Sequence, residues 1–112
     1  METLKFSYNW NNKLETKHFT TIRLSPRFQV GEIVGVELKG KRMNNAKCIG
    51  KQETRIYHLK EYECYLDTGY GVEQTKAILK RMYAGKDWER LPVYIYLFKS
   101  LGHKESPIDT LF

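Results

Sequence analysis

Long apolar runs are missing from this sequence, and so are the usual marks of export. No stretch of about 18 consecutive apolar residues occurs, which argues against a membrane-spanning helix. The first ten residues, METLKFSYNW, have no basic flank followed by an apolar stretch, so no secretory signal peptide is visible. We therefore expect a cytoplasmic protein with no membrane partner.

Cysteine is scarce as well. The chain has only Cys48 and Cys64, which lie far apart and lack the Cys-x-x-Cys spacing of many zinc and redox sites. The favoured interpretation is two reduced, buried thiols in a cytosolic protein, and a disulfide between them is the alternative. Because no cluster of histidine and cysteine accompanies them, we expect no metal and no cofactor.

What the sequence does contain is enough for one small core. Its 112 residues suit a single domain spanning 1–112, and 41% are hydrophobic and 13% aromatic. The formal net charge is +6 and the sequence pI is about 9.3, which is compatible with a nucleic-acid or nucleotide partner.

One segment, HFTTIRL at 18–24, alternates as a strand does. A period of two places Phe19, Thr21 and Arg23 on one face and the residues between them on the other. Such a density of polar side chains is either a solvated face or the wall of a binding site. Pro26 then breaks the pattern.

Other strands are expected on both sides of this one. Residues 4–8 alternate in a short strand or extended lead-in, and 32–40 read as a half-buried strand. Residues 39–43, KGKRM, predict a basic, solvated hairpin loop. Residues 46–59 then supply either one long bent strand or two short ones.

The pattern changes to helical after these strands. Residues 58–69 place Leu59, Tyr62 and Leu66 at helical spacing, and 72–85 predict a second amphipathic helix. Six consecutive apolar residues within PVYIYLFKS then predict a strand buried on both faces.

This order of a few strands, two adjacent helices and a closing strand predicts an α+β domain. A small, strongly bent sheet that closes into a barrel buries one face of every strand most economically. The core is expected at about 4–99, followed by a tail over 100–112 that has turn residues and no period.

The chain resembles an ASCH domain, a small fold of the PUA-like superfamily. The resemblance rests on KHFTTIR (17–23), FQVGEIVGVEL (28–38), HLKEYECYLDTGYGVEQTKAILKRMY (58–83) and VYIYLFK (93–99). It implies a PUA-like β-barrel of about five to six strongly bent strands, with two adjacent helices inserted before the last strand. The superfamily is associated with RNA binding, and the small bacterial members that look most similar hydrolyse the acetyl group of acetylcytidine nucleosides.

The resemblance also assigns residues. The threonine and arginine of the family pattern fall on Thr21 and Arg23, and its lysine falls on His18. The glutamate that the amidohydrolases carry between the two helices falls on Thr68, with Asp67 beside it. The lysine and glutamate positions therefore depart from the pattern.

Three functions stay open at this stage. In the first, a basic cleft with Lys17, Arg23 and Arg27 binds RNA, a nucleoside or a nucleotide, and Tyr70 stacks on a base. In the second, the domain is an amidohydrolase, and in the third it is a non-catalytic interaction domain with a vestigial cleft.

The amidohydrolase hypothesis gives each residue a role. Thr21 is the nucleophile and His18 its base, because a histidine with a pKa near 6.5 suits proton abstraction at neutral pH. Asp67 protonates the leaving group, and Arg23 holds an anion or a carbonyl oxygen.

Overall fold

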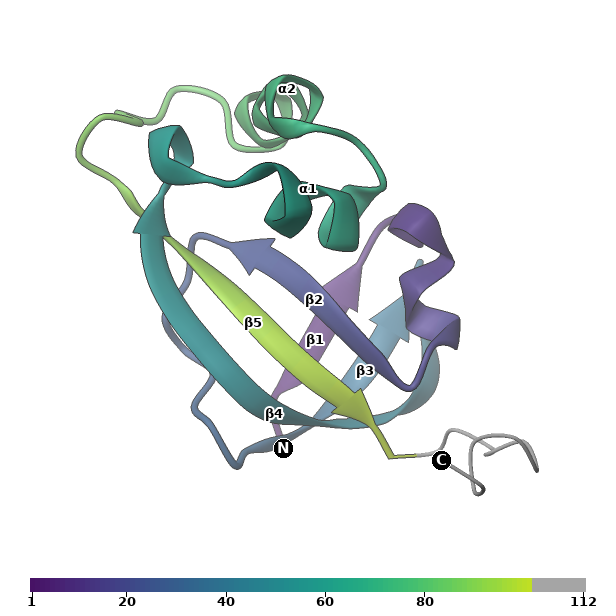
Figure 1. Ribbon diagram of the computed structural model, residues 1–112. Coiled ribbons are helices and arrows are strands. Elements are labelled where there is room, and N and C mark those ends of the chain that lie inside the picture. Colours follow the sequence, from purple (N-terminus) through teal and green to yellow (C-terminus); the bar gives the residue numbers. More distant parts are fainter. Residues whose placement is uncertain (102–112) are drawn as a thin grey trace.

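The protein is an α+β domain in which a layer of helices covers one end of a curled five-stranded sheet (Figure 1). The computed structural model describes residues 1–101, and the end of the tail lies outside them. The elements are β1 (Thr3–Phe6), η1 (Trp10–Glu15), β2 (His18–Arg23), β3 (Ile33–Leu38), β4 (Lys41–Arg55), η2 (Ile56–His58), α1 (Glu61–Thr68), α2 (Val72–Met82) and β5 (Pro92–Ser100). The two α-helices precede the last strand, as the sequence predicts.

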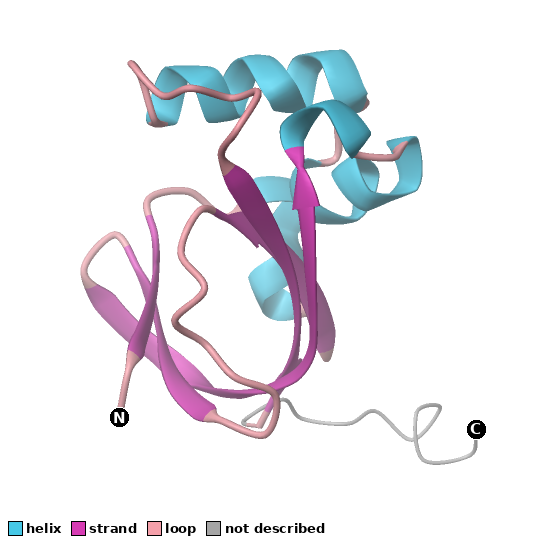
Figure 2. Cartoon of the chain, turned by 90° about the vertical axis from the view of Figure 1, so that its left-hand side faces the viewer, coloured by secondary structure: helices cyan, strands magenta, loops and turns pink. Residues whose placement is uncertain are grey.

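The sheet is a half barrel. Its strand order is β1-β3-β4-β5-β2, with β1 and β3 parallel and the other pairs antiparallel. The 15-residue strand β4 pairs with β3 and β5 and changes register between Cys48 and Gly50, where a bulge lets the strand bend. Figure 2 shows the resulting curl. Strands β1 and β2 are the two edges, and we call the gap between them the seam.

Strand β2 has the two faces that its sequence predicts. Phe19 and Thr21 are buried inside the curl, where Phe19 stacks on Phe98 with ring centroids 5.7 Å apart. Ile22 faces the other way and is buried against the helix layer. Strand β2 is therefore covered on both faces over this stretch, which fixes its register strongly.

Two apolar cores follow from this arrangement. The first fills the curl and is built largely of aromatic rings and valines. The second lies between the sheet and the helices and includes Ile56, Cys64, Leu79 and Val93. Because both faces of the central strands are buried, β5 carries the near-continuous apolar run seen in its sequence.

The buried face of α1 differs from the predicted one. Tyr62 and Leu66 are 60% and 55% exposed, whereas Cys64, Asp67 and Thr68 are buried. The inward face is polar because its side chains bond to neighbouring segments. Thr68, for example, shares a hydrogen bond of 2.8 Å with the hydroxyl of Thr75 on α2.

The predicted basic loop at 39–43 is shorter than expected. Lys39 and Gly40 both have positive φ, at 52° and 81°, and form a tight turn between β3 and β4. Such a two-residue turn matches the twist of a hairpin, so strand pairing resumes at Lys41.

Candidate functional site

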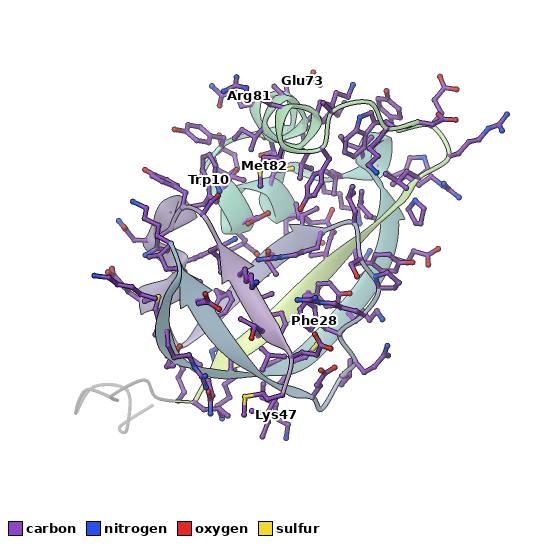
Figure 3. All side chains as sticks on the ribbon, turned by 180° about the vertical axis from the view of Figure 1, so that it is seen from behind. Trp10, Phe28, Lys47, Glu73, Arg81 and Met82 are labelled. Atoms are coloured by element: carbon purple, nitrogen blue, oxygen red, sulfur yellow. The ribbon has the colours of Figure 1, made fainter. Side chains whose placement is uncertain are left out.

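A pocket of about 530 Å³ opens at the seam, where the helix layer meets the two edge strands. Its walls come from β1 and the loop after it, η1, β2, the β3–β4 turn, the end of α1 and α2. Figure 3 labels Trp10 and Met82, which both line it at the helix-covered end, while Lys47 lies at the opposite end of the molecule. We call this cavity the seam pocket.

The wall of the seam pocket contains a buried ion pair. The ammonium of Lys13 donates to Oδ1 of Asp67, and the two residues are only 3% and 5% exposed. The other carboxylate oxygen, Oδ2, accepts the backbone N–H of Ile22 at 3.1 Å. Asp67 therefore ties α1 to η1 and to β2, and both members of the pair line the same pocket as Thr21.

Burial also changes the proton affinity of Lys13. Loss of solvation lowers the pKa of this ammonium, and the nearby charge of Arg23 lowers it further. The carboxylate of Asp67 acts in the opposite direction and only partly offsets the effect of burial. Lys13 is thus more readily neutral than a surface lysine, and a buried titratable group in a pocket is a typical mark of a functional site.

Thr21 and Arg23 form the strand wall of the same pocket. Nε of Arg23 donates to the Thr21 hydroxyl at 3.1 Å, and a terminal nitrogen donates to the carbonyl of Lys5 on β1 at 2.7 Å. The guanidinium also lies 4.6 Å from the ring centroid of Phe6. Arg23 therefore bridges the seam from β2 to β1. Its charge lies next to the hydroxyl of Thr21, a residue that is only 3% exposed.

Aromatic side chains surround the pocket mouth. Tyr8 and Trp10 line the pocket and meet edge to face with centroids 4.7 Å apart. Trp10 in turn contacts Tyr70, with centroids 6.4 Å apart. Rings of this kind offer flat apolar surface on which a planar ligand can stack.

The structure brings some of the predicted site residues together and separates others. Thr21, Arg23 and Asp67 all line the seam pocket. Arg27 lines a smaller hollow next to it, and Tyr70 stands beside Trp10 at the rim.

His18 and Lys17 lie elsewhere. His18 is exposed at the start of β2, where it pairs across the sheet with Lys99, and it does not line the seam pocket. Lys17 precedes that strand, and its carbonyl accepts the N–H of Ser100. The alternation that places Thr21 inside the curl puts His18 on the opposite face, because the two residues are three positions apart and successive side chains of a strand alternate between its faces.

Sequence reasoning did not single out Lys13. This residue lies in η1, a 3₁₀ segment that is interrupted by positive φ values at Asn11 and Asn12. A lysine in an irregular, Asn-rich segment normally points to solvent, and no local pattern marks this one as buried. Its partner lies 54 residues away in the sequence.

The described residues contain no group of three or more His, Cys, Asp or Glu side chains arranged to hold a metal. Over residues 1–101, no helix has the length and apolar character needed to cross a bilayer. No family model, curated protein or solved structure matches this chain.

Proposed function

We propose that the seam pocket binds a nucleoside-sized ligand and that the half barrel is an ASCH-type, PUA-like domain. The observation that carries this proposal is the convergence of Thr21, Arg23 and Asp67 on one pocket. Thr21 and Arg23 are the threonine and arginine of the motif on which the resemblance rests, and Asp67 lies in the last turn of α1. The volume of about 530 Å³ lies in the range typical of small-molecule sites.

The chemistry of the pocket suits a base with polar edges. Trp10 and Tyr8 offer stacking surface at the mouth, while the Thr21 hydroxyl and the Arg23 guanidinium offer hydrogen bonds deeper in. A concave pocket of this size favours one nucleoside, or one unpaired base, over an extended strand lying across a flat surface.

A second candidate function, hydrolysis of an acyl group on such a nucleoside, is favoured by Lys13. This amine lies in the same pocket as Thr21, is paired with Asp67 and has a lowered pKa. It is better placed than His18 to be the base of the amidohydrolase hypothesis, because His18 is exposed outside the pocket.

The corresponding reaction has two stages. The Thr21 oxygen attacks the acyl carbonyl, Lys13 takes the hydroxyl proton, and an N–H of Arg23 stabilises the charge on the carbonyl oxygen. The amide C–N bond breaks, and the leaving amine receives that proton. Water then cleaves the acyl-threonine ester in the same way, which releases the carboxylic acid and restores Thr21.

The test uses a matched pair of threonines. Thr21→Val removes the hydroxyl in the pocket. Thr20→Val removes a neighbouring hydroxyl on the other face of β2, for which residues 1–101 offer no hydrogen-bond partner. Calorimetry with cytidine and N4-acetylcytidine measures binding, and chromatography of the products measures hydrolysis. Thr21→Val is expected to reduce turnover by at least about 10³-fold, and Thr20→Val to leave it unchanged.

The outcomes separate the functions. Binding without turnover supports the binding proposal and contradicts the hypothesis that the domain is a hydrolase. Turnover that survives in Thr21→Val would exclude Thr21 as the nucleophile. If neither compound binds at millimolar concentration, the third hypothesis, an interaction domain with a vestigial cleft, is the one left. Tight binding of single-stranded RNA that weakens steeply with salt would favour a strand ligand instead.

A further inference from the structure

A second, smaller hollow of about 300 Å³ adjoins the seam pocket and shares Lys5, Arg23 and Tyr83 with it. Its remaining lining residues are Leu24, Ser25, Arg27 and Phe28, the last of which is labelled in Figure 3. Three of the seven lining residues are cationic and none is acidic. We call this cavity the cationic hollow.

The charges around the cationic hollow are poorly compensated. Lys5 makes no ion pair within the described residues, and Glu37, its register partner on β3, lines the seam pocket and not the hollow. Arg27 lies 3.5 Å from a carboxylate oxygen of Glu2, but both side chains are about half exposed, so water screens that contact. The hollow therefore keeps a net positive potential.

Arg23 and Arg27 are close enough to repel each other. Burial is the main reason that the pKa of Arg23 is lowered. The negative charge of Asp67 opposes this shift, and the positive charge of Arg27 adds to it. An anion bound between the two guanidinium groups removes this repulsion, and it restores to Arg23 part of the solvation that burial took away.

Both guanidinium groups are held in place by the protein. Arg27, on the loop after β2, donates to the carbonyl of Thr3, as Arg23 does to that of Lys5, so both arginines are anchored to β1. Each also lies 4.6 Å from the centroid of a phenylalanine ring. A guanidinium has five N–H donors, and these contacts leave some of them on each arginine for a ligand. Such fixed, forked donors match a phosphate group well, and their order is established before the ligand arrives.

We propose that the cationic hollow binds the phosphate group of a nucleoside monophosphate whose base occupies the seam pocket. The placement of the base rests on the proposed function above, whereas the phosphate site stands on the residues of the hollow itself. The ligand class is then a free nucleotide carrying a phosphate monoester, whose charge near pH 7 is close to −2.

The experiment compares ligands that differ only in phosphate. Calorimetry measures the affinity for cytidine, for its 5′- and 3′-monophosphates and for a cytidine dinucleotide, whose single phosphate is a diester. Inorganic phosphate, followed by ³¹P NMR, tests the hollow without any base. We expect one monophosphate to bind at least about 10-fold more tightly than cytidine, with an advantage that shrinks as salt is added.

Two variants probe the hollow and a third is the control. Arg27→Gln and Lys5→Gln each remove one charge at the hollow. Arg90→Gln removes one from a side chain that is 90% exposed, on the loop between α2 and β5, and that lines neither cavity. We expect the first two to reduce the advantage of the monophosphate to below about threefold and the control to preserve it. Lys5→Gln tests the hollow even if Arg27→Gln fails to fold, since Lys5 makes no ion pair in the described part of the chain.

Failure of this inference differs from failure of the proposed function. If cytidine and both monophosphates bind with equal affinity and inorganic phosphate does not bind, the proposed phosphate site is wrong. The proposal that the seam pocket binds a nucleoside is then still supported. If no nucleoside or nucleotide binds but inorganic phosphate does, and Lys5→Gln abolishes this, the hollow is an anion site and the nucleoside proposal fails. A dinucleotide that binds more tightly than both monophosphates would overturn the assignment to a free nucleotide.

Discussion

Lys13 and Asp67 form a buried ion pair that joins η1 to α1 across 54 positions of the sequence. Both groups lie in the wall of the seam pocket, so the same contact contributes to the fold and to the candidate site. Removal of one charge from such a pair leaves the other buried without compensation.

The first prediction concerns stability. Lys13→Met should lower the free energy of unfolding by about 3–5 kcal/mol, and adding Asp67→Asn should restore part of this loss by neutralising the remaining carboxylate. Urea denaturation followed by circular dichroism measures both. Lys76→Met is the control, because its partner Glu73 is 88% exposed, so water screens the ion pair and it contributes less than about 1 kcal/mol. Equal, small effects in Lys13→Met and Lys76→Met would show that the Lys13 amine is well hydrated.

The second prediction concerns pH. Burial holds the pKa of Lys13 below its ordinary value of 10.5. Between that lowered pKa and 10.5, the unfolded chain binds a proton at Lys13 that the folded chain does not. The contribution of Lys13 to the free energy of unfolding therefore rises with pH across this window. Urea midpoints should be measured for the wild type and for Lys13→Met at several pH values up to about pH 10. The midpoint of the wild type should rise relative to that of the variant as the pH increases. Parallel curves for the two proteins would contradict a lowered pKa.

The third prediction concerns the thiols, which are free and buried within the described residues. Burial raises the pKa of both Cys48 and Cys64, so little reactive thiolate is present at neutral pH. A disulfide-exchange reagent such as DTNB should modify the folded protein at least about 10-fold more slowly than the urea-unfolded protein, in which both thiols react. Rapid reaction of one thiol in the native protein would show that its segment opens easily.

The fourth prediction concerns the end of α1. Gly69 has φ of +83°, and a Cβ atom built there would lie 3.2 Å from the side chain of Asn11, which donates to the carbonyl of Tyr65. Gly69→Ala should cost about 1–2 kcal/mol for the left-handed conformation alone, plus a further term for displacing Asn11. Gly85→Ala is the matched control, because φ there is +79° and no atom lies within 4 Å of the added carbon.

Thermal and urea unfolding of the two glycine variants separates strain from contact. The excess loss in Gly69→Ala over Gly85→Ala measures the packing of Asn11 against the end of α1. If the two variants lose the same stability, that contact contributes nothing, and α1 is held to η1 by the Lys13–Asp67 pair instead.

Much of the fold was predictable because its signals are local. The alternation in β2 and the apolar run in β5 both follow from which faces of a strand are buried. The buried face of α1 was not predictable in this way. In an eight-residue helix, a few polar contacts with neighbouring segments outweigh the apolar pattern, and Leu66 is left exposed while Asp67 is buried.

The site was predictable only in part. Period-two alternation already put Thr21 and Arg23 on one face, and it already put His18 on the other. Lys13 carried no signal, because an irregular turn gives its side chain no direction that sequence spacing can reveal.

The sequence by itself determined the class of fold, the two faces of β2 and the pairing of a hydroxyl with a guanidinium at Thr21 and Arg23. Only the tertiary structure decided that Lys13 is the further cation that lines the seam pocket with these two residues. A charged side chain is buried where a partner from a distant segment compensates its lost hydration, and for Lys13 that partner is Asp67. Local sequence patterns describe a residue and its neighbours along the chain, and they contain no information on a partner that the fold brings from 54 positions away.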